Sequence, residues 1–389
     1  MITLKLAFRN LFGAGLRTWL NVFVLSFAFV IIVFMNGMLD GWNRQAYNDT
    51  KEWAIGSGQL WHVSYDPYDP YCLQDAHAPV TGQMAELVIS QKITPVLVSQ
   101  ASLFPGEGMQ NILLKGIDPS QQIIRLPSAS LKTSDDFITA IIGKRMAASA
   151  RLKIGDHVLM QWRDKNGTFD AREILIADIF SANVPSIDNG QVWISLAELQ
   201  KITGLQNEAT FFIAGPQYTG GDTDNWKFKD TKYLMKDIDE VMQAKKSGTS
   251  VVYILLLAIA LLAIFDTQVL SIFRRQKEIG TYIALGMTRW NVIKIFTAEG
   301  TALSILAILL GCVYGIPLLA MLQKTGIPMP KSVDSYGLAI SDAIVPFYSM
   351  GLILSTVLLV IISATIVSYF PTRRISKMNP TEALKGKIQ

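Results

Sequence analysis

Four long apolar segments constrain this chain more than any other feature of its sequence. A helix needs about 20 apolar residues to cross the hydrocarbon core of a bilayer, and we expect such spans at 18–39, 249–273, 295–323 and 343–372. Backbone polar groups in lipid must form their hydrogen bonds within the segment, so each span is predicted to be helical. Only 17% of the 389 residues are charged, against about a quarter in an average soluble domain. The chain is therefore predicted to be a membrane protein.

Lysine and arginine are concentrated in three of the segments that flank the predicted spans. They occur in an amphipathic segment at 1–17, in the segment 274–294 and in the tail at 373–389, whereas the loop at 324–342 has balanced charges. Positive residues are retained on the cytoplasmic side, so we expect both termini inside and the segment between the first two spans outside. The first span is longer than the apolar core of a signal peptide and has no small-x-small cleavage site after it, which favours an uncleaved anchor.

The outer segment is predicted to be a folded α+β domain at 42–228, followed by a stalk helix at 229–248 with a possible interruption near Ser247. Alternating or β-rich runs predict strands, and the pair Asn166-Gly167 between two of them predicts a hairpin. Ser195 and Glu198 have the spacing of a capping box, and Gly204 suits the helix end. A loop is expected at 66–83. The strands are predicted at 59–65, 158–163, 169–180, 192–194 and 209–213.

The sequence offers little for a disulfide framework or a metal site. Of the two cysteines, Cys72 and Cys312, the second lies inside an apolar stretch that we place in the bilayer, so both are interpreted as free thiols. His62, His77 and His157 lack the closely spaced Cys or His neighbours of a zinc site. We therefore predict no metal ligand, no cofactor ligand and no catalytic residue in this chain.

The segment 274–294 is predicted to form two helices that meet at a tight cytoplasmic turn. Ile279, Ile283 and Leu285 provide apolar positions, Gly286 can end one helix and Thr288 can cap the next. Such a turn could dock into a cleft of a cytosolic partner. The alternative is that its basic residues only fix the topology and contact lipid headgroups.

Here the sequence resembles a known family. The residues Lys277-Glu278-Ile279-Gly280, then Ala284-Leu285-Gly286, then Phe296 with Glu299 and Gly300, are similar to the signature of permeases related to the cell-division protein FtsX, the macrolide exporter MacB and the lipoprotein-releasing LolC and LolE. Pro371-Thr372-Arg373-Arg374 and the segment 379–384 resemble that family's ending, and 143–156 resembles its outer domain. The resemblance covers nearly the whole chain and is weakest over 66–130.

This resemblance implies a permease pair that works with two cytosolic ATPase subunits, which bind the ATP and magnesium. ATPase closure would move the stalks and outer domains through a coupling helix at the turn. The sequence contains no Gly-x-x-x-x-Gly-Lys-Ser/Thr loop, and no ATPase segment precedes 1–17, which disfavours a fused exporter of the MacB type. The coupling residues carried over from the family are Arg275, Lys277, Glu278, Ile279, Gly280, Ile283, Leu285 and Gly286.

Two acidic residues and three glycines within the spans need separate interpretations. Asp266 and Glu299 are costly in lipid and could relay protons, but we favour an interfacial position for Glu299 and, for Asp266, a pairing within the bundle or with Arg274. An intramembrane enzyme would need these two acids as its catalytic pair. The three glycines, Gly300, Gly311 and Gly315, are predicted to allow close helix packing.

Taken together, these patterns predict an α-helical protein of the inner membrane with four transmembrane helices and an α+β extracytoplasmic domain between the first two. The expected function is permease activity in an ATP-driven transporter, acting on lipoproteins or other periplasmic or membrane-anchored cargo. Its expected partners are an ATPase, a second permease, its cargo and membrane lipids, and no nucleic acid. The alternative is an FtsX-like regulator that transmits ATPase motion to a cell-wall hydrolase and transports nothing.

Overall fold

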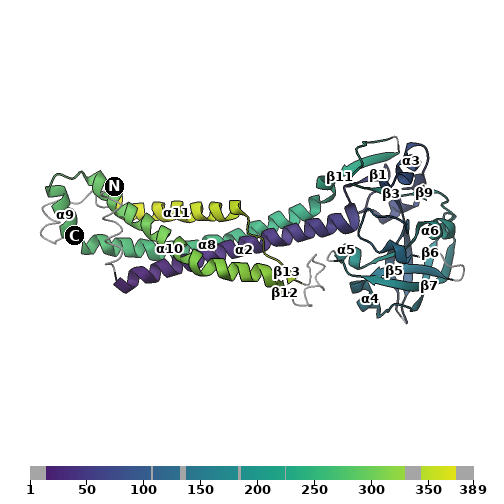
Figure 1. Cartoon of the computed structure of the whole chain (residues 1–389), viewed down its shortest axis with the longest axis horizontal. Helices are drawn as coiled ribbons and strands as arrows, with labels where there is room; N and C mark the ends of the chain where they lie inside the picture. The colour runs from purple at the N-terminus through teal and green to yellow at the C-terminus, as the bar shows by residue number, and fades with distance from the viewer. Residues whose placement is uncertain are drawn as a thin grey trace. The chain divides into compact units, whose positions relative to one another are not determined.

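A computed structural model describes residues 15–106, 108–131, 137–182, 185–223, 225–328 and 343–373. The chain divides into two compact units (Figure 1). The first comprises 1–42, 242–327 and 345–389, and the second comprises 43–241 and 328–344. The predicted segment 1–17 lies largely outside the described residues, as do most of the loop 324–342 and the tail beyond Arg373.

The helices that could cross a membrane are long and continuous. Among the described residues, four are long and apolar enough to span a bilayer, which confirms the predicted number and order. They are α2 (Gly15–Thr50, continued by a π-helical turn at Lys51–Ile55), α8 (Lys236–Arg274), α10 (Arg289–Thr325) and α11 (Met350–Thr372), and a short helix, α9 (Gln276–Ala284), lies between α8 and α10.

Three helices differ in extent from the segments predicted for them. The first helix continues to Thr50, past the apolar segment that ends at 39, because 40–50 is polar but contains no proline. The stalk at 229–248 and the span at 249–273 are one helix, α8, which begins at Lys236 and has no interruption at Ser247. The last span begins at Met350 rather than 343, because Ser349 caps that helix by accepting a hydrogen bond from the Leu352 amide.

The first unit packs its four spans around a shared apolar core, which includes Leu25, Ile264, Leu303 and Val360 from four different helices. Polar side chains join the same helices in pairs. The Ser26 hydroxyl donates to the Tyr314 hydroxyl at 2.9 Å, Thr301 and Thr365 share a hydrogen bond of 2.9 Å, and the Asn21 amide donates to the Ala263 carbonyl and to Thr267. Hydrogen bonds between helices are a common means of association in lipid.

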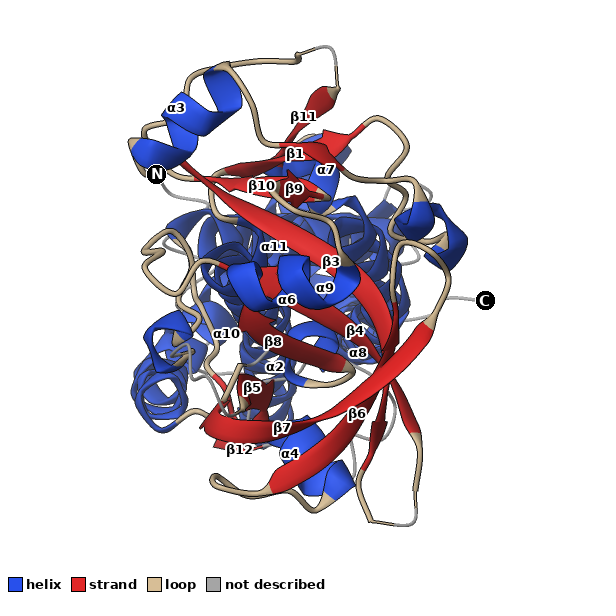
Figure 2. Cartoon of the chain, turned by 90° about the vertical axis from the view of Figure 1, so that its right-hand side faces the viewer, coloured by secondary structure: helices blue, strands red, loops and turns tan. Residues whose placement is uncertain are grey.

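The second unit is built on a nine-stranded sheet (Figure 2). Its strand order is β11-β1-β10-β3-β4-β8-β5-β7-β6, and β6 pairs back with β3. The six strands from β3 to β6 therefore close into a barrel, and β11, β1 and β10 extend the sheet from the first half of β3. The strands are β1 (Gly58–His62), β3 (Ile93–Phe104), β4 (Gln110–Ile117), β5 (Ile138–Gly143), β6 (His157–Arg163), β7 (Phe169–Phe180), β8 (Gln191–Ser195), β10 (Phe211–Ala214) and β11 (Trp226–Asp230).

The interior of the barrel is apolar because side chains alternate along each strand. Leu114, Met160 and Ile194 are fully buried there, and they are packed against Leu199 of the helix α6 (Leu196–Thr203) and Met146 of the helix α4 (Lys144–Ala150). The shorter elements of this unit are η2 (Pro70–Gln74), β2 (Ala78–Pro79), α3 (Gln83–Ile89), η3 (Ser128–Ser130), α4 (Lys144–Ala150), α5 (Pro185–Asp188), α6 (Leu196–Thr203), β9 (Glu208–Ala209) and α7 (Thr231–Leu234), and two-residue strands occur at Ile327–Pro328 and Ala343–Ile344.

Local predictions in this unit have mixed outcomes. The hairpin at Asn166-Gly167 is confirmed, since β6 and β7 pair in antiparallel fashion on either side of it. Gly204 ends α6 with a φ of +76°, as predicted. The capping box is wrong, because the Ser195 side chain makes no cap hydrogen bond. Two strands of the barrel, β3 and β4, lie within 66–130, where the resemblance to the family is weakest.

Candidate functional site

The turn between α8 and α10 is formed by three local features of the sequence. Arg275 leaves helical geometry, with φ −103° and ψ 19°, and separates α8 from α9. Gly286 has a φ of +94°, a conformation that suits glycine and ends α9. Thr288 then caps α10 by accepting a hydrogen bond from the Asn291 amide. The predicted segment 274–294 is therefore a helix, a tight turn and the first residues of the next helix.

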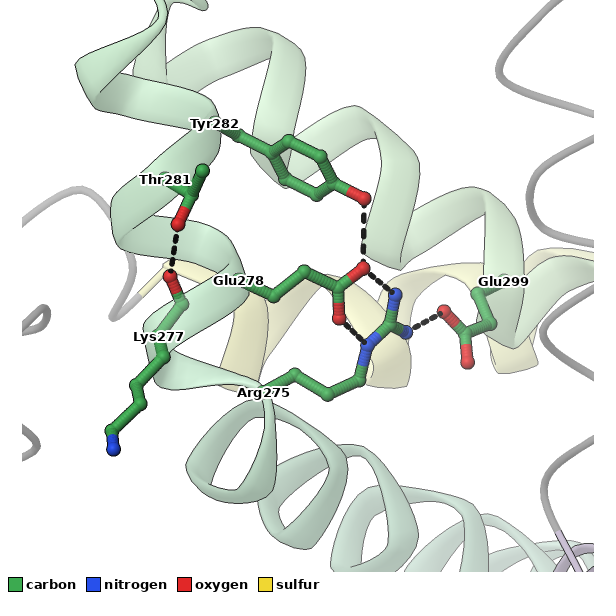
Figure 3. Close-up of polar contacts among 6 residues, drawn as sticks. All are labelled: Arg275, Lys277, Glu278, Thr281, Tyr282 and Glu299. Atoms are coloured by element: carbon green, nitrogen blue, oxygen red, sulfur yellow. Dashed lines mark hydrogen bonds and ion pairs between the residues drawn. The ribbon is translucent and has the colours of Figure 1, made fainter.

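Arg275 lies at the centre of a polar network that joins the turn to α10 (Figure 3). Its Nε donates to Glu278 at 2.6 Å and its second terminal nitrogen donates to the other oxygen of the same carboxylate at 2.9 Å. The remaining terminal nitrogen donates to Glu299 of α10 at 2.9 Å. One planar guanidinium thus holds two carboxylates from two helices, which a lysine could not do with the same geometry.

Tyr282 completes the network. Its hydroxyl donates to Glu278 at 2.7 Å, one helical turn further along α9 (Figure 3). The hydrogen bonds from Arg275 and Tyr282 lower the pKa of Glu278, while its carboxylate raises the pKa values of both donors. Glu278 is therefore ionised across the physiological range, and the turn is held by charge-assisted hydrogen bonds.

Apolar packing fixes the inner face of α9. Ile279 is fully buried in a small core with Ile272, Val292 and Phe296, and the Arg275 guanidinium lies 4.8 Å from the centre of the Phe296 ring. The network and this core lie on the same side of the helix. The inner face of α9 is thereby committed to contacts within the chain.

The outer face of the turn has a different character. Leu285 is 81% exposed although it is a leucine next to a tight turn. Lys277, Gly286 and Trp290 are exposed as well, while Ile283 is partly buried and Gly280 is buried. An apolar tip with basic neighbours is a surface on which a partner protein could pack.

The three glycines of the spans lie at close helix contacts. A Cβ atom at Gly300 would lie 2.0 Å from the Ser368 hydroxyl of α11. Gly311 and Gly315 face α2, where a Cβ would lie 2.9 Å from Phe29 and 2.8 Å from Val30. These positions exclude larger side chains without movement of a neighbouring helix, as expected for small residues at helix interfaces.

The two acidic residues of the spans differ in their surroundings. Glu299 is 7% exposed and paired with Arg275, and its expected position at the membrane interface stays a prediction. Asp266 is exposed on α8, and no hydrogen bond or ion pair reaches it from the residues that the structure describes. Asp266 and Arg274 form no ion pair, and the expected pairing of Asp266 within the bundle stays a prediction because the side chains of 1–18 are not described. Arg274 lies about 12 Å further along the same helix.

Sequence reasoning missed Tyr282 and the buried pair Gln268 and Ser368. Tyr282 follows Glu278 by four residues, a spacing that places two side chains on one helix face and could have identified it. Gln268 and Ser368 each keep a buried polar atom without a hydrogen bond beside Gly300, and they come from α8 and α11. In the C-terminal motif, Pro371 and Thr372 close α11, while residues 379–384 lie outside the described residues.

Comparison with known proteins agrees with this architecture. Residues 250–380 match the family model described as the FtsX-like permease C-terminal domain. The chain is 21% identical over 328 residues to the lipoprotein-releasing system transmembrane protein LolC of Xylella fastidiosa (strain 9a5c), covering 75% of this chain and 76% of that protein. It is 20% identical over 167 residues to the macrolide export ATP-binding/permease protein MacB of Wolinella succinogenes, covering 43% of this chain and 23% of that protein.

A search of solved structures finds the extracellular domain of the noncanonic ABC-type transporter YknZ from Gram-positive bacteria, with a TM-score of 0.28, 11% identity, and coverage of 44% of this chain and 99% of that domain. The matched permease domain begins just inside α8 and includes the Arg275 network, α10 and α11. The chain therefore contains an FtsX-like permease C-terminal region at 250–380, has four candidate spans with a β-rich domain between the first two, and is similar over three quarters of its length to LolC.

Proposed function

We propose that this permease receives the motion of a cytosolic ATPase subunit at the turn from Arg275 to Gly286 and passes it to its extracytoplasmic domain to release lipoproteins from the membrane. The observation that carries the proposal is the division of α9 into two faces. Its inner face is fixed to α10 by the Arg275 network, and its outer tip presents Leu285 to the surroundings. A force applied to the tip is therefore delivered to the spans.

The contacts above the turn support transmission along the spans. Arg275 follows α8 directly, and Glu299 lies on α10 between Thr297 and Thr301, which both contact α11. Thr297 then pairs with Thr372 at 3.1 Å, and Thr301 pairs with Thr365 at 2.9 Å. Displacement of α9 would thus reach α8, α10 and α11 through side chains in contact, and α8 continues into the second unit.

Lipoproteins are the proposed cargo because LolC, named for lipoprotein release, is similar to this chain over three quarters of both sequences. The proposed topology places both termini and the turn in the cytoplasm, since basic residues mark these ends of the spans. The proposed partners are an ATPase with its bound ATP and magnesium, and a second permease subunit.

The proposal is tested by Leu285→Asp in the full-length chain. A carboxylate at the tip opposes apolar packing on a partner but removes little packing among the described residues, since Leu285 is 81% exposed. We expect the tagged variant to insert normally and to lose co-purification of the ATPase from native membranes, measured by mass spectrometry of the captured proteins and by ATP turnover of the captured complex. Ile89→Asp is the matched control, because Ile89 is 82% exposed on the outer domain.

Equal ATPase capture and turnover with Leu285→Asp and the wild type would overturn the docking assignment. Capture of a cell-wall hydrolase in place of a lipoprotein would replace the proposed cargo with the regulatory function of FtsX-like proteins. Cytoplasmic labelling of a cysteine introduced at Lys277 checks the topology independently, and labelling from the outer side would contradict it.

A further inference from the structure

The first turns of α10 and the last turn of α11 bring aromatic and basic side chains together in the first unit. The Trp290 ring of α10 meets the Tyr369 ring of α11 edge to face, with 6.4 Å between the ring centres. The Lys294 ammonium lies 5.8 Å from the centre of the Trp290 ring, one helical turn further along α10. Trp290 is 53% exposed, and Lys294 is exposed as well. A partly open surface thus combines two aromatic rings with a cation.

The depth of this cluster in the bilayer follows from a neighbouring contact between the same two helices. The helix α11 has 23 residues and is therefore about 34 Å long, close to the thickness of the hydrocarbon core. Its last residue, Thr372, shares a hydrogen bond of 3.1 Å with Thr297 of α10, so this pair marks the end of the apolar layer. Lys294 and Trp290 precede Thr297 by three and seven residues, about 4.5 and 10 Å along the helix axis. Lys294 therefore lies at the level of the lipid headgroups and Trp290 at their outer edge.

The same flank of the two helices continues into the apolar layer as an exposed apolar surface. Ile366 and Ile362 precede Tyr369 by three and seven residues and so share its face of α11, where both are exposed. On α10, Ile305 follows Lys294 by eleven residues, about three turns of a helix, and is exposed too. The aromatic and basic cluster at headgroup level is thus followed, deeper in the bilayer, by apolar surface that an acyl chain can cover.

We infer that this flank of α10 and α11 binds a phospholipid with an anionic headgroup, whose phosphate pairs with Lys294 beside the Trp290 ring. Its acyl chain covers Ile362 and Ile366. Tryptophan and tyrosine favour the membrane–water interface because an apolar ring carries a group that can form a hydrogen bond. A lysine at this depth extends its ammonium to the phosphates while its methylene groups stay on apolar surface. The inference goes beyond the proposed function, since it involves neither an ATPase nor a cargo.

Charge favours an anionic lipid over a zwitterionic one. Arg373 follows Tyr369 by four residues and is exposed on the same face of α11, so it brings a second positive charge to this flank. The one acid of α10, Glu299, is paired with Arg275 and does not cancel these charges. Basic residues beside transmembrane helices attract anionic headgroups, and each contributes a factor of about five in affinity.

Depth favours a lipid over a protein partner. A cytosolic protein could reach Trp290, which lies beyond the apolar layer. Ile366 and Ile362 precede Thr372 by six and ten residues, so they lie about 9 and 15 Å inside that layer. A ligand that covers the aromatic cluster and these isoleucines together must extend from the headgroups into the hydrocarbon core, as a phospholipid does.

Lipid binding is tested with the purified full-length chain in detergent. Dioleoylphosphatidylglycerol, which is anionic, and dioleoylphosphatidylcholine, which is zwitterionic, are titrated separately, and retained lipid is measured by native mass spectrometry. The variants are Lys294→Gln, which removes the charge, Lys294→Arg, which keeps it, and Trp290→Ala, which removes the ring. Lys324→Gln is the matched control, because Lys324 is exposed at the opposite end of the same helix.

We expect the wild type to bind the phosphatidylglycerol at least about fivefold more tightly than the phosphatidylcholine. Lys294→Gln should lower the affinity for the anionic lipid about fivefold and leave the zwitterionic lipid nearly unaffected, whereas Lys294→Arg and Lys324→Gln should retain the wild-type preference. Trp290→Ala should weaken the binding of both lipids, because the ring favours the interface whatever the headgroup charge. A photoactivatable phosphatidylglycerol should label peptides from 289–305 and 362–373 more than the other spans.

Equal affinities of the wild type for the two lipids would overturn the inference. Equal losses in Lys294→Gln and Lys324→Gln would do the same, because they would show a general attraction of basic residues to anionic lipid, and so would labelling spread evenly over the four spans. If Trp290→Ala and Lys294→Gln bind lipid normally but lose the ATPase, the cluster belongs to the docking surface of the turn and the inference fails. Leu285→Asp leaves Trp290 and Lys294 in place, so failure of this inference and failure of the proposed function are distinguishable.

Discussion

The two units of this chain differ in where they place polar side chains. The barrel of the second unit excludes them from its interior, where Leu114, Met160 and Ile194 meet. The membrane unit places them inside, between helices, as in the pairs Ser26 with Tyr314 and Thr301 with Thr365. In water the apolar interior drives folding, whereas in lipid it gives no net driving force between helices and polar contacts take over part of that role. Substitutions of one residue type should thus have different effects in the two units.

The largest effect is expected from Arg275→Met. It leaves Glu278 without its main donor and Glu299 buried with no partner, and breaking a buried ion pair costs about 3–5 kcal/mol. We expect the turn to become sensitive to protease in inverted membrane vesicles and the full-length chain to unfold at lower temperature. The control is Arg274→Met, an exposed neighbour with no ion pair among the described residues. If both variants behave alike, the network does not stabilise the membrane unit.

The second prediction compares the same substitution in both units. Leu114→Ala opens a cavity in the barrel and is expected to cost about 2–5 kcal/mol, because Leu114 is fully buried. Leu358→Ala on α11 should cost less than about 1 kcal/mol, since Leu358 is 62% exposed in a lipid-facing position. Denaturant unfolding of the purified full-length variants measures both. A similar loss in the two variants would contradict the contrast between the units.

The third prediction is that glycine-to-alanine substitutions at two positions of the membrane unit change its stability in opposite directions. Gly300→Ala places a Cβ atom 2.0 Å from the Ser368 hydroxyl, and relief of that clash is expected to cost about 1–3 kcal/mol. Gly351→Ala meets no atom within 4 Å and should stabilise α11 by up to about 1 kcal/mol through helix propensity. Thermal unfolding in detergent tests the difference. Gly300→Ala at wild-type stability would show that α10 and α11 can separate there without cost.

Much of the membrane unit could be predicted from sequence because its signals are local. Each signal involves residues that are close in sequence. An uncharged apolar run predicts a membrane span, a cluster of basic residues predicts its cytoplasmic end, and the segment from Gly286 to Thr288 predicts a turn between two helices. The helix interruption predicted near Ser247 is absent, and the reason is also local. The Ser247 and Thr249 hydroxyls donate to the carbonyls of Gln243 and Lys245, four residues earlier, so polar side chains are accommodated within a continuous α8.

The barrel could not be predicted because its closure depends on distant residues. Ala101 to Phe104 pair with Leu159 to Trp162, about sixty residues later, and no local pattern encodes that pairing. The same holds at the turn. Arg275, Glu278 and Tyr282 share a helix-scale spacing that can be read directly, whereas Glu299 reaches Arg275 only because α10 folds back along α8.

The smallest effect is expected at a polar residue that departs from the rule of the second unit. Lys115 on β4 is half-buried, lies 5.1 Å from the centre of the Trp193 ring, and has no carboxylate partner among the described residues. Burial lowers the pKa of Lys115 from 10.5 to about 8. Below pH 8 the folded protein carries the desolvated ammonium, while the unfolded chain carries a hydrated one, so the lysine costs stability there.

Lys115→Met should therefore stabilise the second unit at pH 7, by about 1–2 kcal/mol once solvent screening and the contact with Trp193 are counted. Between pH 8 and 10.5 the unfolded chain binds more protons than the folded one, so wild-type stability rises and the advantage of the variant shrinks. Urea unfolding of the full-length protein at pH 7 and pH 10 measures this. Lys227→Met on the edge strand β11 is the control, because Lys227 is exposed. If Lys115→Met is the less stable protein at pH 7, the ammonium contributes more through Trp193 than its burial costs, and polar groups would then stabilise this unit as they do the membrane unit.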